Sequence, residues 1–331
     1  MMTYIHLPKN DEQLVFYLAA EEYIARNMEG DDYFFMWQVD PTVIFGRNQL
    51  IANEVNLDYC REHGIKTFRR KSGGGCVYAD RNNIMLSYIT KEENVNFTFN
   101  RYINMIVLML HKLGVEARPS GRNDIMIGDR KVSGNAFYHI PGRSIVHGTM
   151  LYDTDMRNMV ASITPSEEKL ISKGIQSVRQ HITLLKDYIS LDINEFKMFM
   201  RQHLCDDEIT LGPDDIQQIR EIEKEYLTPD FIYGNNPRCN ITRRQRIEGI
   251  GEFEVRMELK NNIIKSINIA GDFFMAGDID RAIINPLKNV ALDPVAIADA
   301  LPDNIDDIIP HLKKDDLVRL IISDNKPILT T

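Results

Sequence analysis

Cysteine is scarce in this sequence, and long apolar runs are absent. The cysteines Cys60, Cys76, Cys205 and Cys239 are widely separated, with no C-x-x-C pair and no paired histidines nearby. Metal centres and disulfide frameworks normally show closely spaced or regularly patterned ligands, so neither is expected. No segment holds the roughly 18 consecutive apolar residues of a membrane span, so no membrane partner is expected.

Basic residues are in the minority, since 39 lysines and arginines stand against 48 acidic residues, a net charge of −9. Non-specific nucleic-acid binding needs a basic surface, so a nucleic-acid partner is not expected. The segment Met1–Pro8 lacks the basic and long apolar regions of a secretory signal. These absences together predict a cytoplasmic, reduced, globular protein.

The common phosphate-binding motifs are missing as well. There is no G-x-x-x-x-G-K-[ST] and no G-x-G-x-x-G, and the G-x-S-x-G nucleophile motif does not occur. A nucleotide, if one is bound, must therefore be held by a different glycine-rich loop.

Such a loop is present at residues 69–80, where cations precede a run of glycines. Arg69–Lys71 are followed by Ser72 and Gly73–Gly75, after which an apolar and aromatic run begins. Consecutive glycines leave backbone N–H groups uncovered, and neighbouring cations bind carboxylate or phosphate. The pattern favours an anion-binding loop between two strands, and a plain glycine turn with solvated charges is the alternative.

A second polar constellation lies on two neighbouring predicted strands. Asn123 and Asp124 precede the first apolar run, and Lys131, Ser133 and Asn135 alternate along the second. Because side chains alternate in a strand, the last three are expected to share one face. That face suits a ligand, although a solvent-exposed strand face gives the same pattern.

Several further residues are open to two interpretations. His147 lies in a third strand of this set, where a lone histidine is usually a satisfied structural residue. Cys76 directly follows the glycines, either as a small core residue or as a reactive thiol. Lys173 and Arg179 lie in a basic, glycine-containing segment that suits a mobile loop or a solvated surface.

Apolar periodicity and turn residues predict alternating helices and strands. Helices are expected over residues 11–28, 53–63, 98–113, 192–204, 213–226, 293–301 and 313–322, with a further helix start at 164–168. Strands are expected over residues 33–39, 42–45, 65–68, 83–89, 124–127, 131–139, 144–152, 252–260 and 263–269. The first helix is expected to be amphipathic, and Thr98 is expected to cap the helix that follows it. Antiparallel hairpins mixed with helices predict an α+β fold, with a domain connection near residues 240–250.

Four segments, in order, resemble the motifs of lipoate–protein ligases. They are Arg69–Tyr78 (R-R-x-S-G-G-G-x-V-[FY]), Gly121–Asp124 with Lys131–Ala136 (G-R-N-D … K-[IV]-S-G-[NS]-A), His147–Leu151 (H-G-T-L-L) and Lys173–Arg179 (K-G-I-x-S-V-R). The order and approximate spacing agree over residues 10–185, and Thr228–Phe274 is similar to the family's C-terminal part. Four ordered motifs make this resemblance specific.

The resemblance implies an ATP-dependent ligase. Lipoate and Mg-ATP would give lipoyl-AMP and pyrophosphate, and the lipoyl group would pass to a lysine of an apo lipoyl domain of a 2-oxoacid dehydrogenase or of the glycine-cleavage H protein. It also implies a biotin/lipoate ligase-type catalytic domain over residues 1–245, related to class II tRNA synthetases, with mixed, largely antiparallel sheets flanked by helices. A small α+β accessory domain would follow over residues 246–331. ATP and Mg²⁺ are the expected cofactors, lipoate the expected substrate, and a monomer the expected state.

The resemblance also implies roles for individual residues. Lys131 is the expected catalytic cation, bonding the lipoate carboxyl and the α-phosphate. The expected ATP- and adenylate-binding residues are Arg70, Gly75, Cys76, Val77, Tyr78, Asn123, Asp124, Lys131, Lys173 and Ser177. The expected lipoate-binding residues are Arg69, Ser72, Gly73, Gly74, Lys131, Ser133, Gly134, His147 and Gly148. Asp124 is the expected Mg²⁺ ligand, residues 165–180 are expected to close over the adenylate, and apolar residues around Val77 and Tyr78 to line a tunnel for the lipoyl tail.

The sequence departs from the family pattern at two positions. Ala79–Asp80 stands where the family often has His-Asp, so an imidazole that could bond the adenylate is absent, and Cys76 replaces the commoner alanine. Two other functions stay open. One is an acyltransferase that relays octanoyl or lipoyl groups through the Cys76 thiol without ATP, and the other is a non-catalytic protein that binds lipoate or its acceptor.

Overall fold

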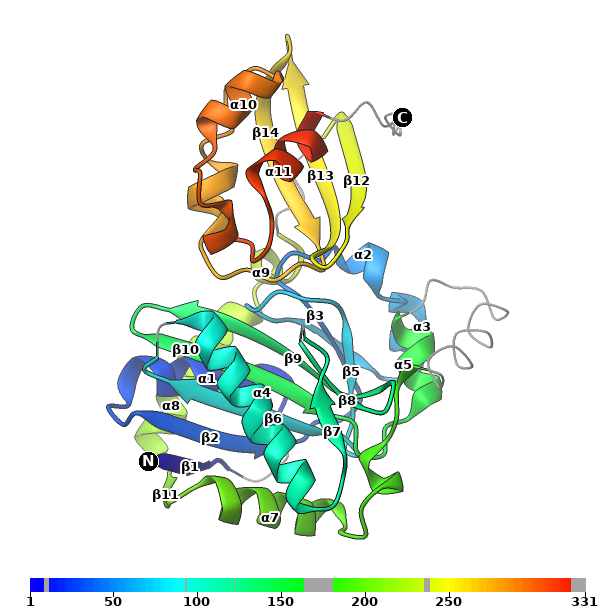
Figure 1. Cartoon of the computed structure of the whole chain (residues 1–331), viewed down its shortest axis with the longest axis vertical. Helices are drawn as coiled ribbons and strands as arrows, with labels where there is room; N and C mark the ends of the chain where they lie inside the picture. The colour runs from blue at the N-terminus through cyan, green and yellow to red at the C-terminus, as the bar shows by residue number, and fades with distance from the viewer. Residues whose placement is uncertain (9–11, 93, 122, 164–180, 235–238, 323–331) are drawn as a thin grey trace. The chain divides into compact units, whose positions relative to one another are not determined.

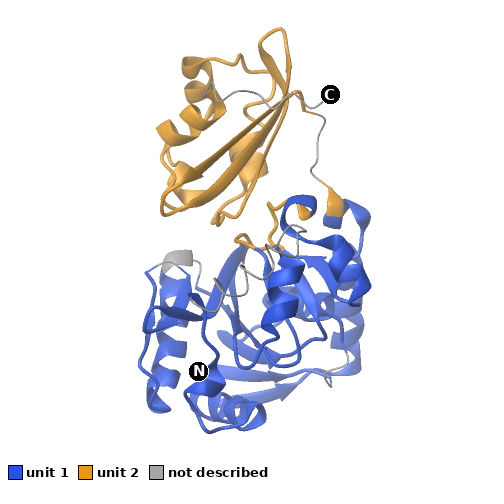
Figure 2. Cartoon of the chain, turned by 90° about the vertical axis from the view of Figure 1, so that its right-hand side faces the viewer, with its two compact units in different colours: residues 1–45, 52–70, 76–232 blue, residues 46–51, 71–75, 233–331 orange. Residues whose placement is uncertain are grey.

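The computed structural model describes residues 1–8, 12–92, 94–121, 123–163, 181–234 and 239–322. The chain packs into two compact units, coloured separately in Figure 2. The first unit comprises residues 1–45, 52–70 and 76–232, and the second comprises residues 46–51, 71–75 and 233–331. Two short segments from the early part of the chain therefore pack with its C-terminal part.

An eight-stranded mixed sheet forms the centre of the first unit, with the strand order β11-β1-β2-β6-β10-β9-β8-β7 (Figure 1). Its strands are β1 Met2–His6, β2 Asp32–Trp37, β6 Ile84–Thr90, β7 Ala117–Pro119, β8 Asp124–Ile127, β9 Arg130–Ile140, β10 Arg143–Met150 and β11 Asp207–Thr210. β1 pairs in parallel with β2 and β11, whereas the run from β2 to β7 is antiparallel throughout. The β9–β10 hairpin turns at Gly142, whose φ of 81° suits glycine.

A three-stranded sheet in the order β4-β3-β5 also belongs to the first unit. Its strands are β3 Thr42–Phe45, β4 Lys66–Arg69 and β5 Val77–Ala79. Among the described residues before 234, the helices are α1 Leu14–Asn27, α2 Ile51–Glu54, α3 Leu57–Glu62, α4 Val95–Lys112, α5 Met156–Ile163, α7 Ile193–Leu204, α8 Pro213–Tyr226 and α9 Pro229–Tyr233. Because β3 and β4 are parallel, the segments that follow them leave the same edge of this sheet.

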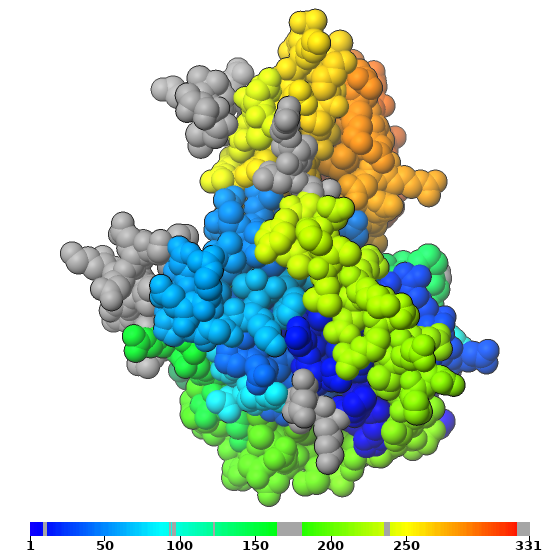
Figure 3. Space-filling model, turned by 180° about the vertical axis from the view of Figure 1, so that it is seen from behind, coloured from blue at the N-terminus to red at the C-terminus, as the bar shows by residue number. Residues whose placement is uncertain are grey.

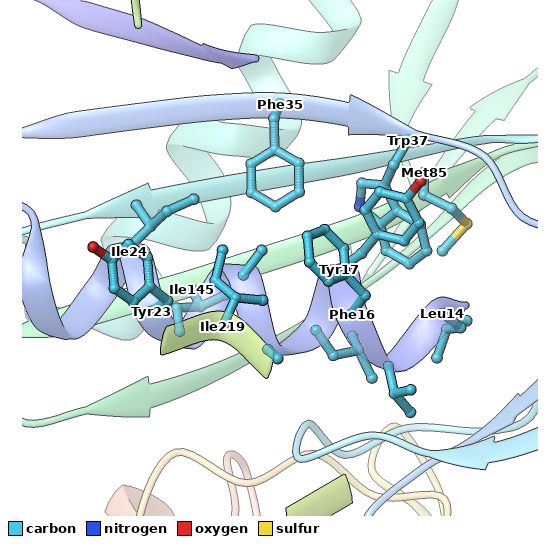
Figure 4. Packing of buried hydrophobic residues seen from close by; sticks show 14 of the residues in the cluster. Leu14, Phe16, Tyr17, Tyr23, Ile24, Phe35, Trp37, Met85, Ile145 and Ile219 are labelled. Atoms are coloured by element: carbon cyan, nitrogen blue, oxygen red, sulfur yellow. The ribbon is translucent and has the colours of Figure 1, made fainter. Parts of the chain in front are cut away.

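Helix α1 is buried along most of its length, with one side on β6 and β10 and another on α8. Tyr17 of α1 stacks on Trp37 of β2 with ring centroids 4.7 Å apart, and Figure 4 shows this packing together with Ile219 of α8. The expectation of an amphipathic first helix is wrong, because α1 is covered on both sides. Glu21 and Glu22 consequently lie inside the protein.

Helix α4 covers the opposite face of the large sheet, where it contacts β7, β9 and β10. The Asn94 side chain caps α4 by accepting a hydrogen bond at 2.9 Å from a backbone N–H three residues later. The expectation that Thr98 is the cap is wrong, since Thr98 lies within the helix. The predicted helix 53–63 likewise divides into α2 and α3, because the Asn56 side chain starts α3 by accepting from the Tyr59 N–H at 3.1 Å.

Helix α8 lies beside N-terminal residues of the chain on the face of the first unit shown in Figure 3. Arg220 of α8 donates to Glu12 at 2.6 Å, and Tyr23 of α1 donates to Asp215. These polar contacts at the margin of the helix pair leave its apolar sides to the core around Ile219.

The second unit contains an antiparallel sheet of β12 Ile241–Ile247, β13 Gly251–Lys260 and β14 Ile263–Gly271. The β13–β14 hairpin turns at Asn261 and Asn262, with φ of 53° and 61°, where the sequence predicts a turn. Helices α10 Pro294–Ala300 and α11 Lys314–Ile322 contribute to the same apolar core as the sheet.

The predicted α+β fold, with mixed sheets flanked by helices and a smaller α+β part near the C-terminus, is confirmed. The short strands β1, β7 and β11 were not expected, because an element of so few residues shows no readable period. The strand expected after the glycine loop is present as β5. The domain boundary between residues 245 and 246 stays a prediction. Within the ranges that the structure describes, no helix combines the length and apolar composition needed to cross a membrane.

Candidate active site

A β-bulge determines the position of Lys131. In the β8–β9 ladder the pairing steps over Val132, which has no counterpart on β8. A bulge interrupts the alternation of side chains along its strand. The Lys131 side chain therefore lies on the face of Asp124, with Nζ 2.8 Å from Asp124 Oδ1, and both side chains are partly exposed.

The expectation that Lys131, Ser133 and Asn135 share one face is therefore wrong. Ser133 Oγ lies 3.3 Å from Asn135 Oδ1, and both residues are buried. Lys131 instead crosses the backbone of Gly134, where an added Cβ would lie 2.6 Å from the lysine Nζ. Gly134 thus provides the space that the lysine side chain occupies beside Asp124.

The Lys131–Asp124 pair stands at one end of a row that crosses the large sheet. In order of cross-strand pairing, the row consists of Trp37, Met85, Thr149, Gly134 and Asp124. Directly paired residues point to the same face. The row therefore changes from buried apolar side chains at the β2 end to the Asp124 carboxylate, with the Lys131 ammonium beside it, at the β8 end.

A buried carboxylate lies on this face of the sheet. Glu21 of α1 is 0% exposed, accepts from Ser87 Oγ at 2.5 Å and lies 2.9 Å from His147 Nδ1. Trp37 Nε1 in turn donates to Ser87 Oγ at 2.9 Å. His147 therefore has a hydrogen-bonding partner within the protein, and its role toward lipoate stays a prediction. Glu21 and Ser87 were not singled out from the sequence, because a glutamate in a helix expected to be amphipathic and a serine in an apolar strand gave no distinctive signal.

Residues on the opposite face hold the segment that leads to Asp124. A Cβ on Gly148 would lie 1.9 Å from Asn135 Oδ1 and 2.8 Å from the Tyr102 hydroxyl of α4. Asn135 Nδ2 donates to Asn123 O at 3.0 Å, and Asn123 Nδ2 donates to Asn135 O at 3.2 Å. This reciprocal pair fixes the backbone from which the Asp124 side chain projects.

Arg69 and Arg70 are buried at the end of β4. Arg69 donates from Nη2 and Nε to Ile232 O at 2.8 and 3.1 Å, and its guanidinium lies 4.6 Å from the centroid of the Phe45 ring. Arg70 donates from Nη1 to Ile44 O at 3.1 Å. Burial lowers the pKa of each guanidinium to about 10, so both remain charged at neutral pH.

Cys76, Val77 and Tyr78 follow the glycines and lead into β5. Burial raises the pKa of the Cys76 thiol to about 12, and the negative charge of Glu54 adds to this effect. Burial also raises the pKa of the Tyr78 hydroxyl. The Cys76 thiol is therefore protonated at neutral pH, which is the inert state for nucleophilic attack.

Asp80, next to the unusual Ala79, holds two turns together. Its carboxylate accepts from the backbone N–H groups of Asn82 at 2.9 Å and Asp155 at 3.0 Å. Burial is the main reason that the pKa of this carboxyl is raised. Ala79 itself is fully buried in β5, so its small side chain fits a closely packed position.

The boundary between the two units passes through the predicted anion-binding loop. Arg69, Arg70 and Cys76 pack with the first unit, as does the Lys131–Asp124 pair, whereas Lys71–Gly75 pack with the second. Ser72 is fully buried. Lys173, Ser177 and the segment 165–180, which was expected to close over the adenylate, lie outside the described residues.

Among the residues that the structure describes, no group of three or more His, Cys, Asp or Glu side chains could hold a metal ion. Asp124 offers a single, partly exposed carboxylate beside an ammonium group. Mg²⁺ is commonly bound by one or two carboxylates together with substrate phosphates. Asp124 therefore fits a magnesium ion that arrives with a nucleotide, and not a site built from protein ligands alone.

Solved structures place this fold among ligases that modify proteins. The chain matches the family model of the lipoyl protein ligase A/B catalytic domain over residues 13–205 and that of the bacterial lipoate protein ligase C-terminus over residues 236–321. It therefore belongs to the lipoate–protein ligase family. Lipoate-protein ligase LplJ of Bacillus subtilis is 33% identical over 317 residues, which cover 92% of this chain and 95% of that protein.

Solved structures agree with this assignment. A bipartite lipoate protein ligase of Thermoplasma acidophilum, studied with its E2 lipoyl domain, has a TM-score of 0.64 at 27% identity, covering 71% of this chain and 97% of that one. A lipoate-protein ligase A bound with ATP has a TM-score of 0.62 at 26% identity, covering 71% and 99%. LipL1 of P. falciparum in complex with lipoate has a TM-score of 0.77 over 97% and 99% of the two chains, but at 21% identity it shows the fold alone.

Proposed function

We propose that this chain uses ATP to activate lipoate as lipoyl-AMP and then transfers the lipoyl group to a lysine of an acceptor protein. The observation that carries the proposal is the Lys131 ammonium, which the bulge at Val132 holds over Gly134 and beside Asp124. A related structure bound with ATP supports nucleotide use. The row from Trp37 to Asp124 supports an acyl substrate with an anionic head.

In the first step, an oxygen of the lipoate carboxylate attacks the α-phosphorus of ATP. The bond from that phosphorus to the oxygen bridging to the β-phosphate breaks, and pyrophosphate leaves with the electron pair. Lys131 would hold the two anionic reactants together and stabilise the charge that develops on the α-phosphate. Losing such a donor typically costs about 3–4 kcal/mol in the transition state.

The phosphates need further partners. Arg70 and the backbone N–H groups of Gly75, Cys76 and Val77 are the proposed ones, with Asn123 and Asp124 positioning the nucleotide. Asp124 would also hold Mg²⁺, which supplies positive charge against the triphosphate when it is bound. Tyr78, Lys173 and Ser177 complete the proposed adenylate-binding set, and segment 165–180 is proposed to exclude water from the adenylate.

In the second step, the neutral ε-amine of an acceptor lysine attacks the acyl carbon of lipoyl-AMP. The mixed anhydride bond breaks, AMP leaves, an amide forms and the amine loses a proton to solvent. We propose lipoyl domains of 2-oxoacid dehydrogenases or the glycine-cleavage H protein as acceptors, supported by the archaeal relative that was studied with its E2 lipoyl domain.

The test combines purified full-length protein, lipoate, Mg-ATP and an apo lipoyl domain, and measures the mass of the acceptor. The expected result is a mass gain of one lipoyl group that requires ATP and is accompanied by pyrophosphate release. In a parallel reaction, a lipoyl thioester donor replaces lipoate and ATP; a mass gain there, with the donor thiol as leaving group and with loss of the gain in Cys76→Ala, would favour the thiol relay instead. Absence of any gain with both acceptor classes, alongside tight lipoate binding, would favour a non-catalytic binding protein.

A further inference from the structure

Gly73 and Gly74 lie against the backbone of the segment Gly271–Met275, which follows β14, and all of these residues belong to the second unit. The Gly74 N–H donates to Phe273 O at 3.1 Å. A Cβ on Gly73 would lie 2.5 Å from the same carbonyl oxygen and 3.0 Å from Phe274 Cα. Glycine is therefore required at position 73 by a close approach of two backbones.

The segment on the other side of this contact is itself held firmly. Gly271 has no room for a side chain, since a Cβ would lie 2.0 Å from Glu252 O. Asp272 Oδ1 accepts from the Glu252 N–H at 2.6 Å. The buried Phe273 ring stacks on Phe253 with centroids 4.5 Å apart. The Phe273 carbonyl is thus presented to Gly74 by a turn with little freedom to move.

Two more backbone hydrogen bonds join the neighbouring segments. The Gly271 N–H donates to Asn48 O at 3.0 Å, and the Arg47 N–H donates to Ser72 O at 2.9 Å. Segments 46–51 and 71–75 are therefore tied to each other and to the turn after β14. This explains why both segments pack with the second unit although they follow β3 and β4 in the sequence.

Gly75 differs from Gly73, because a Cβ at Gly75 would meet no atom within 4 Å. The three glycines therefore serve different purposes. Gly73 and Gly74 meet the turn after β14, while the chain beyond them leads directly to the residues proposed for the adenylate. The sequence analysis predicted that all three glycines bind a substrate.

We propose that the turn Gly271–Met275 is a positioning element for nucleotide binding by the glycine loop. A glycine-rich loop has a large conformational entropy to lose when it orders around a ligand. The contacts of Gly73 and Gly74 with Phe273 order residues 73–75 beforehand, so that the Gly75 backbone is positioned before ATP binds. Preorganisation of this kind increases affinity without a new ligand contact. This inference rests on the proposed function.

The kinetic test uses Gly73→Ala and Asp272→Ala in the full-length protein and measures lipoate-dependent exchange of pyrophosphate into ATP. Each variant is expected to raise the KM for ATP about tenfold, with kcat within about threefold of wild type, since a loosened loop loses preorganisation rather than a reacting group. The double variant should be less than additive, because both changes act on one contact. Val295→Ala, an exposed position in the same unit, is the matched control and should leave both constants unchanged.

A second measurement follows the contact itself through hydrogen exchange of the Gly74 amide by NMR. Exchange should be faster in Gly73→Ala and Asp272→Ala but remain slow in Gly75→Ala, where a methyl group meets nothing. The positioning role would be overturned if the Gly74 amide stays protected from hydrogen exchange in Gly73→Ala. It would also be overturned if that protection is lost and the KM for ATP is unchanged or lower. A wild-type protein that does not exchange pyrophosphate into ATP would contradict the proposed function. Hydrogen exchange of the Gly74 amide would still show whether the contact with Phe273 exists.

Discussion

The Lys131 ammonium lies 2.8 Å from Asp124 Oδ1, and it reaches this position only because Val132 is a bulge residue in β9. In a regular strand the lysine would share the face of Ser133 and lie away from Asp124. The pair gives one face of the sheet a cation with a defined neighbour at the end of a row that begins at Trp37. The predictions below test what this arrangement does.

Replacing Lys131 by alanine is expected to reduce lipoate-dependent adenylate formation by about 10²–10³-fold in kcat, because a donor to the developing charge is lost. The side chain is partly exposed, so the free energy of unfolding should change by less than about 1 kcal/mol. Pyrophosphate release and urea denaturation measure the two effects. Arg130→Ala, at the exposed neighbouring position, is the control, and full activity in Lys131→Ala would remove the role proposed for this lysine.

Gly134→Ala and Gly148→Ala should have contrasting effects. At Gly134 the added methyl meets the end of a flexible lysine, which can move aside, so activity should fall about tenfold or more with a stability loss near 1 kcal/mol. At Gly148 the methyl meets Asn135, which is buried and hydrogen-bonded, so the free energy of unfolding should fall by about 2–4 kcal/mol. Equal stability losses in the two variants would contradict this distinction.

The Cys76 thiol is expected to remain protonated well above neutral pH, because burial raises its pKa to about 12. A raised pKa means that the thiolate fraction increases about tenfold per pH unit up to pH 11, whereas an ordinary cysteine of pKa about 8.5 reaches a plateau. The difference in iodoacetamide labelling between wild type and Cys76→Ala measures this. The variant should also keep ligase activity, and its complete inactivation would support the thiol relay.

Glu21→Ala is expected to destabilise the first unit by about 2–4 kcal/mol, because Ser87 and His147 both lose the buried carboxylate that they contact. Glu21→Gln keeps the volume and one acceptor oxygen, so its loss should be smaller. Denaturant midpoints with an unchanged m-value measure the effect. Glu29→Gln, at an exposed position near the end of α1, should stay within about 0.5 kcal/mol of wild type.

Local features of the sequence were sufficient for much of the fold. Period-2 and period-3.6 patterns located α1, α7, α8 and the β9–β10 and β13–β14 hairpins, since these elements are long enough to show a period. Short strands such as β1 and β11 were not predicted, because they pair with each other across most of the first unit's sequence. The four motifs were likewise sufficient to place the chain in its ligase family.

Tertiary structure decided where the chemically important groups lie. The bulge at Val132 reversed the face of Lys131. Burial of a helix that was expected to be amphipathic placed Glu21 beside His147. The close approach of the turn after β14 leaves no room for a side chain at Gly73, whereas a Cβ at Gly75 would meet no atom within 4 Å. Each of these outcomes depends on what a second segment places opposite the residue, and no period along a single segment contains that information.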